Sequence, residues 1–406
     1  MSDRHKTPVP ESGPSTARGA GAPLDPPSSE DAPQLLERRR VLLALAAMTG
    51  AVALGGCKRR GQVDPRGDLH GEAPPETETK PPTGGNGLPD TKGEALTTSP
   101  KPADDKLGPR LPLRRLGATG VEVTLLGVGG VHVGDAEEKD AQAVIETAIE
   151  EGVRFFDTAN MYSGGLSEKR YGRYLVPKYR DHVFLMSKSL AKSGKGAFEE
   201  LDVSLGRCGC DYFDLWQMHA LESPEDADNR VEAGVLDACE RALKEGKVKH
   251  LGFTGHADYK GHLRMLDHVK KRGLPVATAQ MPINLVDPHY ASFTTNVIKP
   301  CIEHGMGILA MKTLAFGRLM GKNLGWARKD VKLTPIVPEL VTLEQALGYV
   351  WSLPVSVLIS GMENAKQVQQ NAAIARKAGT LDDSERLKLI ATVEKFGGRD
   401  VEFYKE

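Results

Sequence analysis

The sequence predicts an α/β fold, a (β/α)8 TIM barrel with an N-terminal β-hairpin that plugs one of its openings. Three observations predict this class. Short apolar runs alternate with segments of helical period from Leu111 onward. There are eight such runs over ~300 residues, which suits this barrel. Polar residues with catalytic potential directly follow several runs, as expected where strand ends meet at one mouth.

The apolar runs are the predicted strands, and amphipathic segments between them are the predicted helices. Residues 140–152, 229–246 and 342–353 are three of these helices, the last with Thr342 as its N-cap. The predicted strands are Val123–Val128, Val153–Phe156, His182–Met186, Phe213–Met218, Lys249–Phe253, Val276–Gln280, Gly307–Met311 and Val355–Ile359.

A small hairpin is predicted ahead of the first strand. Residues 111–124 read LPLRRLGATGVEVT, with residues 118–120 at the tip of the turn. A hairpin in this place would close the amino end of the barrel.

A doubly wound sheet is the alternative fold for the same alternation of strands and helices. Such a fold would carry a glycine fingerprint and a helix start directly after its first strand. Gly127, Gly129 and Gly130 follow the first run, but His132 stands at the position of the third glycine. We expect no helix to open there, and the barrel is therefore favoured.

The first 57 residues are predicted to be a disordered leader followed by an export signal. Arg38 and Arg39 precede the apolar run Val41–Leu54, which is short for a membrane span and fits a signal-peptide core. The order resembles a twin-arginine signal, and residues 54–57, Leu-Gly-Gly-Cys, resemble a bacterial lipobox with Cys57 as the lipidation site. The alternative is an N-terminal anchor helix that is never cleaved.

Residues 58–110 are predicted to be a disordered tether, because they are rich in Pro, Gly, Glu, Thr and Lys. The barrel domain would then span 111–406. These expectations place an exported protein on the periplasmic side of a bacterial membrane, held by a lipid on Cys57. The twin-arginine export machinery and the membrane would be its partners.

Composition and charge exclude several classes of protein. The formal net charge of −1 gives no reason to expect nucleic acid as a partner. The five cysteines have no repeated CxxC spacing, so neither a disulfide framework nor a zinc site is predicted. A metal-dependent hydrolase barrel would use His132, His219, His250 and His256, but the His-x-His pair typical of such sites is missing. No metal is expected.

Four residues at the ends of predicted strands form the candidate catalytic site. Asp157 follows the second apolar run, Lys188 the third and His219 the fourth, while Tyr162 lies on the loop after Asp157. The carboxyl ends of barrel strands converge, so these side chains would meet. A nearby lysine cation favours the tyrosinate and would lower the pKa of the tyrosine, which predicts a usable proton donor.

The region from about Leu111 to Thr380 resembles the aldo-keto reductases. The resemblance rests on five segments in order, among them an Asp-Thr-Ala-x-x-Tyr motif at Asp157–Tyr162 and the segment DYFDLWQMH that ends at His219. The others are RRLGATGVEVTLLGVGG, GKVKHLGFTGH and SVLISGMENAKQVQQN. The resemblance implies a nicotinamide cofactor across the barrel mouth, with hydride transfer to a carbonyl carbon.

The resemblance also implies a role for each residue of the tetrad. Tyr162 would act as general acid or base, Asp157 would hold the Lys188 ammonium, and His219 would orient the carbonyl oxygen. The implied function is an NAD(P)-dependent oxidoreductase acting on a small-molecule carbonyl or alcohol substrate. The alternative is a non-enzymatic barrel that binds the dinucleotide as a sensor or as a partner subunit.

Several cofactor contacts implied by the resemblance have unusual residue types. Thr254 and His256 stand where the family commonly has a serine–asparagine pair, and Met311 stands where many members have an aromatic residue. NADP is the expected cofactor, with NAD as an alternative because Glu363 would repel a 2′-phosphate. The expected cofactor-binding residues are Thr254, His256, Gln280, Met311, Lys312, Arg318, Gly361, Gln367 and Asn371. His132 and Met161 are expected in the substrate pocket.

Overall fold

The computed structural model describes residues 104–322, 332–379 and 381–405. The predicted leader, the export signal, Cys57 and most of the tether lie outside the described residues. No helix in the described part of the chain is long and apolar enough to cross a membrane.

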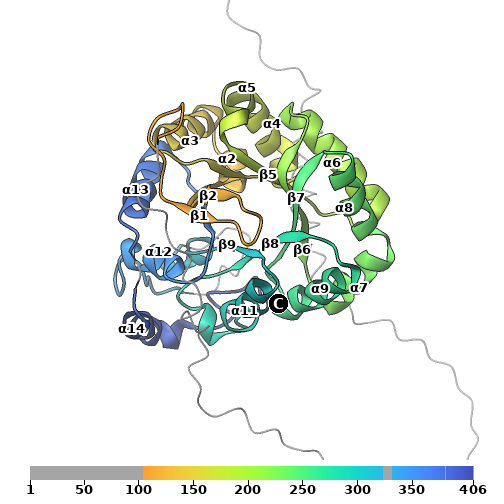
Figure 1. The fold of residues 1–406 in the computed structure, drawn as a ribbon. Coiled ribbons are helices and arrows are strands. Elements are labelled where there is room, and N and C mark those ends of the chain that lie inside the picture. The colour runs from red at the N-terminus through yellow and green to blue at the C-terminus, as the bar shows by residue number, and fades with distance from the viewer. Residues whose placement is uncertain (1–103, 323–331, 380, 406) are drawn as a thin grey trace, which may run out of the picture. The chain divides into compact units, whose positions relative to one another are not determined.

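Eight parallel strands form a closed barrel, as the sequence predicted. They follow one another around the barrel in chain order, and the last strand pairs with the first. Helices surround the barrel (Figure 1). The strands are β3 (Leu126–Gly129), β4 (Phe155–Asp157), β5 (Phe184–Ser189), β6 (Phe213–Leu221), β7 (Val248–Gly255), β8 (Val276–Pro282), β9 (Gly307–Met311) and β10 (Val357–Ser360).

A two-stranded hairpin of β1 (Leu113–Arg115) and β2 (Glu122–Thr124) lies across one opening of the barrel, and Figure 1 looks onto it. The side chains of Leu116 and Val123 pack into the cluster that fills the barrel interior. The other buried members of this cluster are Phe155, Met186, Leu215, Leu309, Val357 and Ile359. The hairpin therefore plugs the amino end of the barrel.

The described helices connect and cover the strands. They are α2 (Gly130–Asp135), α3 (Glu138–Glu150), α4 (Leu166–Tyr174), α5 (Val176–Tyr179), α6 (Gly194–Cys208), α7 (Pro224–Glu232), α8 (Val235–Lys244), α9 (Tyr259–Arg272), α10 (Phe293–Asn296), α11 (Ile298–Glu303), α12 (Leu343–Trp351), α13 (Ala365–Arg376) and α14 (Asp383–Val393). Short 3-10 helices are η1 (Tyr162–Gly165), η2 (Arg180–His182), η3 (Asp287–His289), η4 (Ala315–Met320) and η5 (Glu394–Phe396). Thr342 caps α12 in a capping box with Gln345.

Three predictions about local structure were wrong. The predicted first strand Val123–Val128 is divided between hairpin strand β2 and barrel strand β3. A helix, α2, does open at Gly130, so its expected absence was no argument against a doubly wound sheet. The predicted helix 229–246 is two helices, because Gly234 has a φ of 83° that an α-helix cannot contain.

The chain contacts the barrel earlier than the predicted domain boundary at residue 111. The Asp105 carboxylate pairs with the guanidinium of Arg154 at 2.7 Å. The amide of Leu111 donates to the Gly152 carbonyl at 3.0 Å. Residues 104–110, which we assigned to the tether, therefore lie against the barrel domain.

Candidate active site

The four predicted catalytic residues lie together at the carboxyl ends of β4, β5 and β6. The Lys188 ammonium lies 2.5 Å from a carboxylate oxygen of Asp157. It also donates to the Tyr162 hydroxyl at 3.0 Å and to the Thr158 carbonyl at 2.8 Å. The rings of Tyr162 and His219 meet edge to face with centroids 5.7 Å apart. One lysine therefore joins the aspartate to the tyrosine, and the histidine flanks the tyrosine.

The loop that carries Tyr162 is held by hydrogen bonds from its neighbours. Strand β4 ends at Asp157, and Ser163 takes a left-handed φ of 50° directly after the tyrosine. The Arg207 guanidinium donates to the Asn160 carbonyl at 2.8 Å and to the buried Glu168 carboxylate at 3.1 Å. These contacts fix the loop conformation that brings the phenol over the lysine.

Burial dominates the electrostatics of the tetrad. Burial raises the pKa of Asp157, and the Lys188 cation opposes this rise. Burial lowers the pKa of Lys188, and the Asp157 carboxylate opposes this fall. Burial and the Asp157 carboxylate hold the pKa of Tyr162 well above its usual value. The predicted lowering of the tyrosine pKa by Lys188 is therefore wrong for this arrangement, and the phenol is neutral.

A shift in strand register and a buried arginine shape the end of strand β6 where His219 lies. The pairing of β6 with β7 shifts between Met218 and Leu221, and Ala220 has a φ of 55°. The Ala220 carbonyl accepts from the guanidinium of Arg230 at 3.1 Å, and Arg230 is fully buried. Its Nε atom donates to the Asp226 carboxylate at 3.0 Å. Sequence reasoning missed Arg230, because its contact with β6 depends on how α7 packs.

His219 is neutral in this setting. Burial lowers its pKa well below the usual value, and the Lys188 cation adds to the effect. Its Nδ1 atom is buried without a hydrogen-bond partner among the described residues. A neutral imidazole carries one N–H, which can donate to an oxygen atom bound in the mouth.

The predicted nicotinamide contacts lie on β7 and β8. Thr254 and Gln280 are buried and pair in register across the two strands. The Gln280 amide oxygen is buried without a partner among the described residues. An unpartnered acceptor of this kind fits a carboxamide NH2 group, because leaving a buried acceptor unsatisfied is costly. The residues present therefore fit the nicotinamide end of a dinucleotide.

Met311 and Lys312 lie at the end of β9. Lys312 has a φ of 55°, and its ammonium lies over the rings of Phe316 and Tyr404 at 4.8 and 5.3 Å. Burial lowers the pKa of Lys312 to about 7, and the Lys188 cation contributes to the fall. Lys188 and Lys312 are therefore close enough for one charge to affect the other, and two neighbouring cations suit the binding of an anion.

Arg318 was predicted to clamp the pyrophosphate, and its guanidinium is fully buried against the end of the chain. It donates to the Asp400 carbonyl and lies over the ring of Phe403 at 4.5 Å. The contact between Arg318 and a pyrophosphate stays a prediction. Arg318 would have to bind the pyrophosphate while it keeps its contacts with Asp400 and Phe403.

The predicted adenosine contacts lie at the end of β10 and on α13. The Asn371 amide donates to the Ser360 hydroxyl at 2.9 Å. The Gln367 amide donates to the Glu363 carboxylate at 3.2 Å, at the amino end of α13. A Cβ on Gly361 would lie 2.1 Å from the ring of His132, so only glycine lets this close approach occur.

The two predicted pocket residues lie on the segments that follow β3 and β4. His132 is half-buried in α2, against Gly361, and burial lowers its pKa. Met161 is half-buried and directly precedes Tyr162. His132 therefore contacts the segment predicted to hold the cofactor, and its role in binding substrate stays a prediction.

In the part of the chain that the structure describes, no group of three or more His, Cys, Asp or Glu side chains could hold a metal ion.

The structure is a closed barrel with Asp157, Lys188 and His219 at strand ends and Tyr162 on the segment after β4. A family model described as "Aldo/keto reductase family" matches residues 125–391, which is more than half of the chain. The chain belongs to this family. It is therefore an oxidoreductase of a family that uses nicotinamide cofactors to reduce carbonyl compounds.

Similar proteins occur in plants and bacteria. The chain is 26% identical to L-galactose dehydrogenase of Arabidopsis thaliana over 318 residues, covering 70% of this chain and 94% of that protein. It is 25% identical to the uncharacterized oxidoreductase YrpG of Bacillus subtilis, covering 68% and 93%. The aldo-keto reductase AKR11C1 of Bacillus halodurans shares the fold with a TM-score of 0.59 at 22% identity, covering 70% of this chain and 96% of that one.

Proposed function

We propose that the protein reduces an aldehyde or ketone to an alcohol, or runs the reverse reaction, with Tyr162 as general acid or base. The observation that carries the proposal is the chain of contacts from Asp157 through Lys188 to the Tyr162 hydroxyl, at 2.5 and 3.0 Å. The complete tetrad favours an enzyme over a dinucleotide-binding sensor, because a sensor needs no buried proton donor.

The tetrad can bind and protonate a developing alkoxide. A bound nicotinamide dinucleotide would supply the hydride. The neutral Tyr162 phenol holds the proton that the alkoxide takes up, and the Lys188 ammonium stabilises the tyrosinate that remains. The N–H of the neutral His219 ring would donate to the same oxygen. General acid catalysis of this kind contributes about 10²–10⁴-fold.

The electrostatics of the free protein suit the direction of reduction. Burial keeps the Tyr162 phenol protonated, which is the form that donates a proton. Oxidation of an alcohol would need the tyrosinate, and the negative charge of Asp157 disfavours that form.

NADP is the proposed cofactor, with NAD as the alternative. Glu363 bonds with Gln367 at the amino end of α13, so a carboxylate lies at the position expected to face the adenosine ribose. This charge would weaken binding of a 2′-phosphate. Dissociation constants for NADPH and NADH, compared between the wild type and Glu363→Gln, decide between them. The variant should gain affinity for NADPH and leave NADH unchanged.

Export and lipid anchoring complete the proposal. The twin-arginine order at Arg38 and Arg39 and the lipobox-like residues before Cys57 support them. A twin-arginine route carries folded proteins, so the cofactor could be loaded before export. Palmitate labelling in a bacterial host should be lost in Cys57→Ala. A wild-type chain that takes up no palmitate and retains its first residues would support an uncleaved anchor instead.

The direct test of the proposed activity uses the purified protein with a panel of small aldehydes, ketones and sugars. Substrate-dependent oxidation of NADPH or NADH is expected. Any nucleotide that copurifies is released and identified, which tests cofactor choice and loading together. Absence of dinucleotide binding, with no turnover on any substrate, would overturn the proposal.

A further inference from the structure

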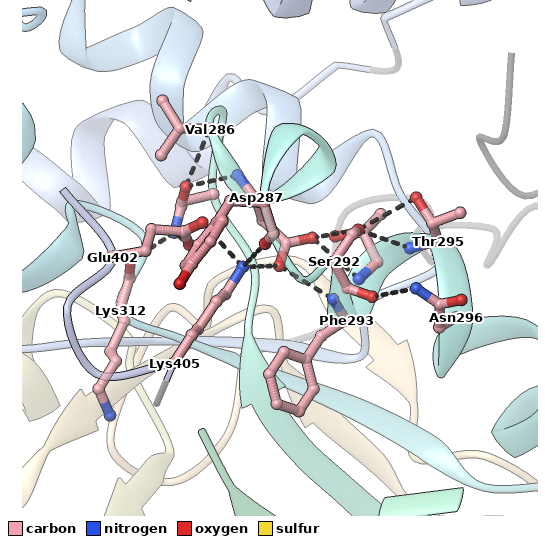
Figure 2. A network of polar contacts seen from close by, with 12 residues as sticks. Val286, Asp287, Ser292, Phe293, Thr295, Asn296, Lys312, Glu402 and Lys405 are labelled. Atoms are coloured by element: carbon pink, nitrogen blue, oxygen red, sulfur yellow. Dashed lines mark hydrogen bonds and ion pairs between the residues drawn. The ribbon is translucent and has the colours of Figure 1, made fainter. Parts of the chain in front are cut away.

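Residues 401–405 fold back against the segments that follow β7 and β8, where specific contacts hold them. Here Val401, Glu402, Tyr404 and Lys405 are buried, and the Glu402 and Lys405 side chains have no exposed surface. We call residues 401–405 the C-terminal strap. Figure 2 shows Lys405 reaching the carboxylates of Asp287 and Glu402.

Lys405 anchors the strap in a buried ionic cluster. Its ammonium lies 2.6 Å from the Asp287 carboxylate, 2.8 Å from the Glu402 carboxylate and 2.8 Å from the Tyr290 carbonyl. Asp287 also accepts hydrogen bonds from Ser292 and from the first turn of α10. Because a buried charge is costly without partners, this cluster specifies one position for the strap.

A second set of bonds ties Tyr404 to the barrel. Its hydroxyl donates to the Glu402 carboxylate at 3.0 Å and accepts from the Asn284 amide at 3.1 Å. Asn284 also donates to Glu402 at 2.9 Å. Asn284 lies just after β8, the strand that carries Gln280, so the strap is fixed to the wall of the candidate site.

Tyr404 contacts two residues of the candidate cofactor site. Its carbonyl lies 3.1 Å from Nδ1 of His256, and its ring lies 5.3 Å from the ammonium of Lys312. A carbonyl only accepts, so Nδ1 carries the proton of the imidazole. The ring is neutral, because burial and the Lys312 cation lower the pKa of His256 to about 3. Nε2 of His256 is then a lone-pair acceptor.

We propose that the C-terminal strap is part of the cofactor site, with Lys405 as a positioning residue. Lys405 holds the Tyr404 carbonyl against His256 and so keeps Nε2 of His256 as an acceptor for the NH2 group of the nicotinamide carboxamide. The Gln280 amide oxygen, which has no partner among the described residues, is the second acceptor for the same group. This inference rests on the proposed function, because it requires a nicotinamide cofactor.

The test compares dinucleotide binding in Lys405→Met, Tyr404→Phe and Lys395→Met. Lys395→Met is the matched control, because Lys395 is an exposed lysine in the same C-terminal region. Binding is measured by titration of the purified full chain with NADPH and NADH, followed by fluorescence. Lys405→Met should bind the dinucleotide about 10-fold more weakly, the loss of about one hydrogen bond. Lys395→Met should match the wild type.

Tyr404→Phe keeps the ring and the backbone carbonyl but removes the bonds to Glu402 and Asn284. It should give a smaller loss of affinity, and it tests the strap if Lys405→Met folds poorly. In the control Lys395→Met the turnover number at saturating cofactor should also match the wild type, because Lys395 is exposed and lies outside both the strap and the tetrad. Unchanged affinity in well-folded Lys405→Met and Tyr404→Phe would overturn the proposal.

Two further measurements separate positioning from general destabilisation. In a His256→Ala background, Lys405→Met should weaken binding no further, because the acceptor that it positions is gone. An equal loss in both backgrounds would contradict the proposal. Nitrogen-15 spectra of labelled histidine should show His256 protonated at Nδ1 in the wild type and a tautomer mixture in Lys405→Met. If the wild type binds no dinucleotide, the proposed function itself fails, which is a different result.

Discussion

Replacement of Lys188 by methionine should destabilise the protein through the carboxylate that it leaves behind. The Lys188 side chain is 1% exposed, and its ammonium contacts Asp157, Thr158 and Tyr162 at 2.5 to 3.0 Å. Removing one partner of a buried ion pair costs about 3–5 kcal/mol, because the other charge stays buried. The exposed pair Lys178–Glu146 gives the control, and Lys178→Met should change stability by less than about 1 kcal/mol.

The loss of stability in Lys188→Met should depend on pH, and the ionisation of Asp157 determines whether the loss grows or shrinks as pH rises. Without the lysine, burial raises the folded-state pKa of Asp157 further above its unfolded value of about 3.9. Between these two pKa values the unfolded chain is ionised while the folded chain holds the proton. Stability of Lys188→Met relative to wild type therefore falls as pH rises above about 4, and most of the loss is present at pH 8.

The assay is urea denaturation at pH 5 and pH 8, combined with carbonyl reduction. Asp157→Asn combined with Lys188→Met should recover most of the stability at pH 8, because no unpaired carboxylate remains. Activity should not recover, because the Tyr162 hydroxyl has lost its cationic partner. A double variant as unstable as Lys188→Met, or a single variant that stays fully active, would refute this account of the pair.

Three further outcomes are expected. Arg230→Met should lower the turnover number about 10-fold, because Arg230 holds the Ala220 carbonyl and Ala220 directly follows His219. In an Ala220→Gly background the loss should be much smaller, since glycine takes the positive φ of residue 220 without strain. Equal losses in both backgrounds would contradict this role of Arg230. Dinucleotide affinity should fall as pH rises above about 7 where the Lys312 cation is lost, and a Lys312→Met titration should be flat. Burial raises the pKa of Glu402 to about 7, so wild-type stability should fall between about pH 5 and 7 relative to Glu402→Gln, as denaturation curves would show.

The barrel and the tetrad were predictable because they rest on local patterns. Each strand is a short apolar run, and Asp157, Lys188 and His219 directly follow such runs. The barrel topology then brings the carboxyl ends of the strands together, so residues that follow different strands in the sequence lie close together in the structure. The role expected for Gln280 came from the family resemblance, and the structure places this residue within β8 (Val276–Pro282).

The features that the sequence did not predict depend on long-range packing. Lys405 and Asp287 lie on segments far apart in the chain, and the strap has no periodic apolar pattern that would indicate burial. Arg318 has the residue type of a phosphate ligand, yet it packs against Phe403. The sequence did not predict the raised pKa of Tyr162, because desolvation depends on the surrounding packing, and the Asp157 carboxylate adds to the rise.

The central claim is that the Tyr162 phenol donates the proton during carbonyl reduction. The most direct test is to measure the rate of this reaction in Tyr162→Phe. Tyr174→Phe is the matched control, because the Tyr174 hydroxyl lies at the outer end of α4 and bonds to Glu138. With a substrate of the wild type, Tyr162→Phe should lose about 10²–10⁴-fold in turnover while its dinucleotide dissociation constant stays unchanged. Tyr174→Phe should match the wild type in both. Turnover that survives in Tyr162→Phe would contradict the assignment of this phenol as the proton donor.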